Sequence, residues 1–183
     1  MTDFHKLADL IRKRNAIGKE ITALIGRPAQ IGHIGEHIAS EVFDIALQES
    51  AVNKGFDGRF RSGPLTGRSV NIKWYAKREG LLDLRPDALP DYYLVMTGPR
   101  ATILTSRGEA RPLLIEQVFL FEARRLLAQL EGRKVKTGVA TSITREQWEA
   151  AEIYPSQKSS LLPVSDAQRA LLKMFGADAS APR

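Results

Sequence analysis

The sequence predicts a single domain in which α-helices are layered on a mixed β-sheet. The chain has 183 residues, a length typical of one domain. Segments with apolar residues at helical spacing alternate with short runs rich in β-branched and aromatic residues, which are typical of strands. Helices and strands mixed in this way indicate an α/β or α+β fold, because a bundle lacks the strands and a β-sandwich lacks the helices.

Two amphipathic helices are expected at the start of the chain. The first spans residues 3–25, carries Lys and Arg on its polar face, and ends at Gly26-Arg27-Pro28. We expect residues 1–28 to form an N-terminal helix that packs on the core. The second helix runs from residue 31 to residue 48, with one apolar stripe.

The middle of the chain reads as strands. Residues 52–60 and 69–77 are expected to form a hairpin, because the Gly- and Pro-containing residues 62–67 between them are rich in turn formers. Residues 92–96 are a continuous apolar run, which is typical of a buried central strand. A shorter strand is expected at residues 102–105.

The C-terminal part adds further helices. Four elements are expected there: helices at 113–130, 145–152 and 165–175, and a strand at 135–143. Thr144 reads as the N-cap of the second of these helices, with Gln147 as its capping-box partner. The core domain should therefore cover residues 29–176, followed by a frayed tail at 177–183.

The composition excludes several kinds of site. The chain has no cysteine, which rules out a disulfide scaffold, a thiol nucleophile, a zinc–thiolate site and an iron–sulfur cluster. No apolar run approaches the roughly 18 residues of a membrane span. The polar N-terminus is unlike a secretory signal. We therefore expect a soluble, cytoplasmic protein with no membrane partner.

The charge distribution points to a polyanion as one candidate partner. The formal net charge is +6, and residues 53–78 hold seven basic residues against a single acid, Asp57. The basic residues of this window are Lys54, Arg59, Arg61, Arg68, Lys73, Lys77 and Arg78. Nucleic acid would suit such a surface, although a merely solvated basic face is the other interpretation.

The expected hairpin carries the best candidate site. Alternation along its strands can bring Asp57, Asn71 and Lys73 together on one polar face. An aspartate offers a hard oxygen ligand for Mg²⁺, and an asparagine adds a neutral oxygen. A lysine can stabilise the charge that develops on a phosphate or orient the attacking water. The three residue types together are therefore suited to metal-assisted phosphate chemistry.

Glu36 is a candidate fourth member of this site. Ala39 and Phe43, which share its side of the predicted helix, are apolar, so Glu36 should lie at the inward rim of the helix. A carboxylate in that place needs a partner, because burying an unpaired charge is costly. A metal ion or Lys73 would satisfy it, and so would a structural ion pair with another Lys or Arg.

The same helix contains an alternative metal motif. His33-Ile34-Gly35-Glu36-His37 matches the H-x-x-E-H pattern of inverted zinc peptidases, with both histidines on one helical face. A zinc site would need a third ligand. That face continues through Ser40, Glu41 and Asp44, which indicates a solvated polar surface instead.

The arrangement of Glu36, Asp57 and Asn71-Ile72-Lys73 resembles that of the restriction-endonuclease-like superfamily, the PD-(D/E)xK nucleases. The family's Asp corresponds to Asp57, its (D/E)xK tripeptide to Asn71-Ile72-Lys73, and the helical Glu of several branches to Glu36. Residues 31–155 are also similar to a family of small, uncharacterised prokaryotic proteins. The resemblance implies an αβββαβ core with a mixed central sheet, extended here by the N-terminal and C-terminal helices.

The resemblance further implies a Mg²⁺-dependent (or Mn²⁺-dependent) DNA endonuclease. Asp57, Glu36, Asn71 and the Ile72 carbonyl would hold the metal, and Lys73 would assist the attack of water on the phosphodiester. The residues expected to follow the DNA backbone are Lys54, Arg59, Arg61, Arg68, Lys77 and Arg78. A homodimer is open, since many such nucleases pair in order to cut both strands.

One departure from the family pattern supports a second hypothesis. Asn71 stands where the motif has Asp or Glu, so the metal site lacks one negative charge unless Glu36 supplies it. A protein with this fold could then bind nucleic acid or a partner protein without cutting, for example in a defence or toxin–antitoxin module.

Overall fold

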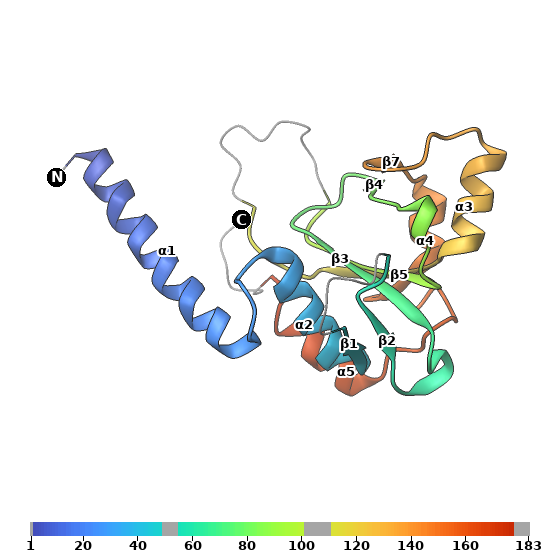
Figure 1. Ribbon diagram of the computed structural model, residues 1–183, viewed down its shortest axis with the longest axis horizontal. Helices are drawn as coiled ribbons and strands as arrows, with labels where there is room; N and C mark the ends of the chain where they lie inside the picture. The colour runs from blue at the N-terminus through green and yellow to red at the C-terminus, as the bar shows by residue number, and fades with distance from the viewer. Residues whose placement is uncertain (1, 49–54, 101–110, 178–183) are drawn as a thin grey trace.

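The computed structural model of the chain describes residues 2–48, 55–100 and 111–177 (Figure 1). The strand expected at residues 102–105, the start of the strand expected at 52–60, and Lys54 lie outside these residues. The same holds for the end of the expected frayed tail. No helix in the described part of the chain has the length and apolarity needed to cross a membrane.

The centre of the molecule is a mixed six-stranded sheet in the order β1-β2-β3-β5-β6-β8. Its strands are β1 (Ile45–Leu47), β2 (Gly58–Phe60), β3 (Ser69–Tyr75), β5 (Tyr92–Thr97), β6 (Gln117–Glu122) and β8 (Glu152–Tyr154). Only β3 and β5 pair in parallel, and the other neighbours are antiparallel. The mixed α/β class expected from the sequence is confirmed, as is the hairpin formed by β2 and β3.

Five α-helices accompany the sheet in the described residues. They are α1 (Asp3–Ile25), α2 (Ile31–Phe43), α3 (Ala123–Gly132), α4 (Arg145–Ala151) and α5 (Asp166–Lys173). A second, two-stranded sheet pairs β4 (Leu81–Leu82) with β7 (Thr141–Ser142). Two single 3₁₀ turns, Gly63–Leu65 and Pro86–Ala88, complete the elements.

Each face of the central sheet has its own apolar core. α2 and α5 cover one face, and α3, α4 and the small sheet cover the other (Figure 1). The central strand β5 contributes to both, with Leu94 and Met96 in the first core and Tyr93 and Val95 in the second. A strand buried on both faces reads as a continuous apolar run, so the prediction for residues 92–96 is confirmed.

The two tryptophans of the chain are divided between these cores. Trp74 lies in the core beneath α2, and its indole N–H donates to the carbonyl of Leu114 at 3.0 Å. Trp148 lies in the other core, where its ring meets that of Phe119 edge-on with 4.7 Å between centroids. Both layers of the molecule are therefore held by large aromatic side chains.

The end of the second predicted helix differs from the structure. α2 ends at Phe43, not at residue 48, because Asp44 takes a left-handed conformation (φ 51°) and its N–H caps the helix on Ser40. The chain then continues as β1, which pairs with β2. This early end gives the sheet an edge strand that the helical pattern hid.

The helix expected at residues 113–130 is also wrong in its first half. Gln117–Glu122 form β6, and α3 begins only at Ala123. Val118 to Phe121 are all buried because β6 lies between β5 and β8 with both faces covered. A run that is apolar on both faces carries no alternation, so its pattern cannot distinguish a strand from a buried helix.

The N-terminal helix has the predicted bounds but not the predicted packing. α1 spans Asp3–Ile25 and ends on Gly26 in a left-handed conformation, as the sequence indicates. However, α1 contains no buried residue, and it leads away from the sheet and its covering helices (Figure 1). The expectation that residues 1–28 pack on the core is therefore corrected: only the C-terminal end of α1 approaches α2.

Candidate active site at the fork between β2 and β3

Asp57 lies where β2 separates from β3. Its backbone N–H donates to the carbonyl of Val70 at 2.8 Å, and its own carbonyl accepts from the N–H of Gln48 at 2.9 Å. Its carboxylate Oδ2 accepts from the N–H of Ile72 at 2.6 Å. In a regular antiparallel pair this N–H would donate to a backbone carbonyl of the neighbouring strand. Here the Asp57 carboxylate takes the place of that carbonyl. The Asp57 side chain is thereby fixed at the fork of the hairpin, in the plane of the sheet.

The surroundings make the negative charge of Asp57 costly. Burial raises the pKa of the carboxyl group above the usual range of an aspartate, and the charge of Glu36 raises it further. The hydrogen bond from Ile72 and the positive charges of Lys73 and Arg27 act in the opposite direction. A carboxylate with this balance gains from any cation that reaches it.

Lys73 is half-buried on the face of β3 that points away from α2. The opposite face of β3 belongs to the core beneath α2 through Val70, Ile72 and Trp74. Tyr75, two residues beyond Lys73, packs against the other core. Since strand residues alternate between faces, Asn71 and Lys73 lie on the Tyr75 side.

The ammonium group of Lys73 is partly desolvated. Burial lowers its pKa, and the nearby Arg85 lowers it further, whereas the charges of Asp83 and Asp57 favour the protonated form. Asp83 itself is held in place, since its Oδ1 accepts from the N–H of Ala140 at 2.8 Å. The charges of two carboxylates, Asp57 at the fork and Asp83 after β4, therefore act on the ammonium group of Lys73.

Two amide oxygens near Asp57 have no hydrogen-bond partner among the described residues. They are Oδ1 of Asn71 and Oε1 of Gln48, and both are buried. Asn71 follows Val70, and Gln48 follows β1, so the two residues flank Asp57 on the neighbouring strands. Leaving a buried acceptor unpaired costs free energy. These two unpartnered oxygens are therefore candidate ligands for a cation, or candidate acceptors for a donor, at the fork.

Glu36 already has a protein partner. A guanidinium N–H of Arg27 donates to its Oε2, and only 16% of the Glu36 side chain is exposed. α2 approaches β3 closely here, because a Cβ on Gly35 would lie 3.0 Å from the Cβ of Trp74. Of the partners that the sequence left open for Glu36, the structure contains the ion pair with an arginine.

The predicted quartet is only partly brought together. α2 carries Glu36 on one face of β3, whereas Lys73 points to the other face. Asp57 lies between them at the fork, and its carboxyl group senses the charge of both. The structure therefore places Asn71 and Lys73 on one side of β3 and Glu36 on the other, with Asp57 at the fork.

The possible ligands at the fork are all oxygens, and only one of them is charged, which suits a hard divalent cation. In the described part of the chain, no three His, Cys, Asp or Glu side chains form a metal-binding group. The fork instead offers one carboxylate, from Asp57, with the unpartnered oxygens of Asn71 and Gln48. Mg²⁺ and Mn²⁺ take oxygen ligands of these kinds and retain water at the other positions.

The alternative zinc motif gains no third ligand. The Nδ1–H of His33 donates to the carbonyl of Pro28 at 3.0 Å. Within the described residues, neither His33 nor His37 has two further ligating side chains beside it. The H-x-x-E-H pattern therefore carries no functional argument.

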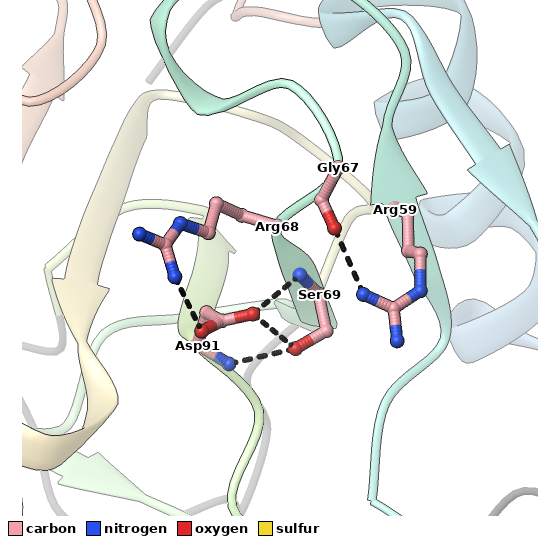
Figure 2. A network of polar contacts seen from close by, with 5 residues as sticks. All are labelled: Arg59, Gly67, Arg68, Ser69 and Asp91. Carbon is pink, nitrogen blue, oxygen red and sulfur yellow. Dashed lines mark hydrogen bonds and ion pairs between the residues drawn. The ribbon is translucent and has the colours of Figure 1, made fainter.

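Two of the arginines expected to bind nucleic acid help to fix the start of β3 and β5 (Figure 2). Asp91 accepts from both the N–H and the hydroxyl of Ser69, at 2.8 and 2.7 Å. Arg68 approaches the same carboxylate at 3.4 Å, and Arg59 donates to the carbonyl of Gly67 at 2.8 Å. Burial alone would raise the pKa of Asp91, but these hydrogen bonds and charges outweigh it and hold the pKa below its usual range.

The other expected phosphate contacts differ in accessibility. Arg61 is exposed and lies 3.5 Å from a carboxylate oxygen of Asp44. Lys77 is buried, with its Nζ 3.0 Å from Glu79, so its ammonium group is not presented on the surface as the sequence suggests. Arg59, Arg61 and Arg68 keep exposed side chains despite their contacts.

Arg78 opens onto a second basic feature, a cavity of about 240 Å³. Arg100 and Arg145 also line it, with Trp148 and Glu79 among the remaining walls. Burial lowers the pKa of Arg78, and the like charge of Arg100 lowers it further. An anion in this cavity would relieve that repulsion.

The structure adds residues that sequence reasoning missed. Gln48 and Arg27 join Asp57 and Glu36 at the fork, and Arg100 and Arg145 complete the basic cavity. Comparison with protein-family models finds no match, and neither does comparison with curated proteins. The functional argument therefore rests on the geometry of the fork.

Proposed function

We propose that the protein is a Mg²⁺-dependent or Mn²⁺-dependent endonuclease of the restriction-endonuclease-like kind, which hydrolyses phosphodiester bonds in DNA. The observation that carries the proposal is the carboxylate of Asp57, anchored on β3 through Ile72, beside the partly desolvated ammonium group of Lys73. An acid can hold the divalent cation, and an amine can stabilise the charge that develops on the phosphate, so both residue types suit metal-assisted phosphodiester hydrolysis.

The residues at the fork divide the work. Asp57 holds the cation, with the amide oxygens of Asn71 and Gln48 as neutral ligands. The carbonyl of Ile72 faces the same neighbour as its N–H, as both groups of one strand residue do, so it also points toward the fork. When bound, the cation would withdraw negative charge from the phosphate that is attacked. Lys73 stabilises the charge that develops there and keeps the attacking water oriented.

The basic surface would position the DNA. The three arginines of the 240 Å³ cavity lie beyond the C-terminal end of β3, the strand that carries Lys73. A backbone phosphate in this cavity would be held by Arg78 and Arg100, and by Arg145 in place of its present ion pair with Glu149, while another phosphate reaches the fork. Guanidinium groups suit this task because they bind phosphate oxygens in pairs.

A nicking assay on supercoiled plasmid tests the proposal. Wild-type protein is expected to nick in Mg²⁺ or Mn²⁺ and to be inactive in excess chelator. Asp57→Ala and Lys73→Ala should each lower the nicking rate by about 10²–10⁴-fold, the usual cost of losing a charged group that acts on the reacting atoms. Asp166→Ala and Lys173→Ala, at exposed positions on α5, are the matched controls and should retain activity.

The second candidate is a protein of the same fold that binds DNA without cutting it. Two observations favour it: Asn71 supplies no charge, and Arg27 occupies the carboxylate of Glu36. In the plasmid assay this function gives DNA retention without nicking in either metal. Nicking that survives both Asp57→Ala and Lys73→Ala would contradict the proposed site altogether.

A further inference from the structure

Most of the apolar face of α1 is uncovered, and only its C-terminal end, with the half-buried Ile21 and Ile25, approaches the core. None of its residues is buried, although the structure describes all of them. Leu10 and Ile17 are 52% and 57% exposed, and Leu24 is 81% exposed. Phe4, Leu7 and Ile11 are also exposed large apolar side chains. Soluble domains rarely leave a contiguous apolar stripe of this size without a partner.

The apolar residues of α1 follow a heptad repeat. Counting Leu7 as position a, the a and d positions are Asp3, Leu7, Leu10, Arg14, Ile17, Ile21 and Leu24. Five of these seven are Leu or Ile, and the e positions hold Phe4, Ile11, Gly18 and Ile25. A repeat of two apolar residues in seven is typical of a seam between two helices that wrap around each other. A helix that packs on a globular core does not need this spacing.

The position of α1 leaves room for a partner helix. α1 joins the core only at its C-terminal end, where Gly26 turns the chain, and it extends freely from there (Figure 1). Its 23 residues are roughly 35 Å long. In proteins most of the stability of an amphipathic helix comes from packing of its apolar face rather than from helix propensity. A second helix on the seam would supply the packing that the core does not.

We propose that α1 pairs with α1 of a second copy of this chain, in antiparallel orientation. This orientation places Leu7 of one copy beside Leu24 of the other, and Leu10 beside Ile21. Arg14 then shares its layer with Ile17, whereas a parallel pair would set the two Arg14 side chains against each other in one layer. The partner is thus a second copy, and the interface is the a and d seam of α1.

The charges beside the seam agree with the antiparallel orientation. The g positions are Lys6 and Lys13 in the N-terminal half and Glu20 in the C-terminal half. In an antiparallel pair the g positions of the two helices face each other, so Glu20 of one copy meets a lysine of the other. In a parallel pair they would face the e positions, which hold Phe4, Ile11 and Ile25 and no charge.

The molar mass of the full chain in solution tests the pairing. Light scattering on wild-type protein, over a wide range of concentrations, is expected to give twice the mass of the chain at high concentration. Leu10→Lys and Ile17→Lys should each shift the protein to the monomer mass. Ala16→Lys, on the outer face of α1, adds the same charge and should leave the dimer intact. Because α1 contributes no buried residue to the core, the emission of Trp74 and Trp148 should be unchanged in all three variants.

Engineered cysteines test the orientation, since the chain has no native cysteine. An oxidised mixture of Leu7→Cys and Leu24→Cys is expected to give a disulfide-linked dimer that joins the two variants, identified by mass spectrometry. Leu7→Cys alone should remain unlinked. Efficient linking of Leu7→Cys to itself would overturn the antiparallel pair. A monomeric wild type, or a dimer that survives Leu10→Lys and Ile17→Lys, would overturn the interface. The result does not depend on nuclease activity, so it stands or falls apart from the proposed function.

Discussion

Asp57 illustrates how a single residue can oppose the stability of the fold. Its carboxyl group binds a proton more tightly in the folded protein than in the unfolded chain, chiefly because it is buried. At neutral pH the ionised group therefore lowers the free energy of unfolding, and this cost shrinks as the pH falls through the raised pKa of the folded protein and is gone below the pKa of the unfolded chain. Residues that pay such a cost are often found where function requires the charge.

We expect Asp57→Asn to raise the free energy of unfolding at neutral pH while it abolishes nicking. Asn keeps an oxygen that can accept from the N–H of Ile72 but carries no charge to desolvate. Urea unfolding of both proteins at several pH values checks this, and the advantage of the variant should shrink as the pH falls. Asp87→Asn, at an exposed position, is the control. A destabilised Asp57→Asn at neutral pH would contradict the argument.

Some residues of the candidate site could be predicted from the sequence, and others could not. Asp57, Asn71 and Lys73 were visible because a hairpin was predictable from its turn formers and its alternation. Gln48 was concealed because the helix was expected to reach residue 48, which would have placed its side chain on another surface. The partner of Glu36 was concealed as well, since Arg27 lies before the helix and no local spacing relates it to Glu36.

At the scale of elements, boundaries that depend on neighbouring residues were predicted correctly, whereas strands that depend on tertiary burial were not. The bounds of α1 and the N-cap of α4 depend on a few neighbouring residues, and these predictions agree with the structure. β6 depends on what covers it from both sides, which is information that residues 117–122 do not contain. β1 depends on the left-handed turn at Asp44, a conformation that any sequence adopts rarely.

The N-cap of α4 allows a test at this scale. The hydroxyl of Thr144 accepts from the N–H of Gln147, and the Gln147 side chain accepts from the N–H of Thr144. We expect Thr144→Ala to lower the free energy of unfolding by about 1 kcal/mol, the usual cost of losing an N-cap side chain. Thr144→Ser keeps the hydroxyl and should restore most of the loss in chemical denaturation. An unchanged Thr144→Ala would show that the capping box contributes nothing here.

At the scale of the whole molecule, the distribution of positive charge should govern binding to DNA. The exposed arginines of the β2–β3 hairpin and the arginine-lined cavity lie at opposite ends of β3. A duplex that contacts both would pass the fork where Asp57 and Lys73 lie. Each phosphate contact releases counterions, so the affinity should fall steeply with salt.

We expect Arg100→Ala to weaken DNA retention and to reduce the salt dependence of binding. The loss of one phosphate contact lowers the slope of log affinity against log salt by about 0.9. Fluorescence anisotropy with a labelled duplex at several salt concentrations measures this slope. Lys173→Ala, at an exposed position on α5, is the control and should keep the wild-type slope. Equal slopes for wild type and Arg100→Ala would remove the cavity from the binding surface.

The separation of Trp74 and Trp148 has a practical consequence. Each layer of the molecule contains a natural fluorophore, and the sheet stands between the two. Trp74→Phe leaves an emission that reports on the side of α3 and α4 alone, and Trp148→Phe leaves one that reports on the side of α2 and α5. Stopped-flow unfolding of the two variants gives one rate for each layer, without any attached dye. Equal rates would show that the two layers unfold in one cooperative step, and different rates that one unfolds before the other.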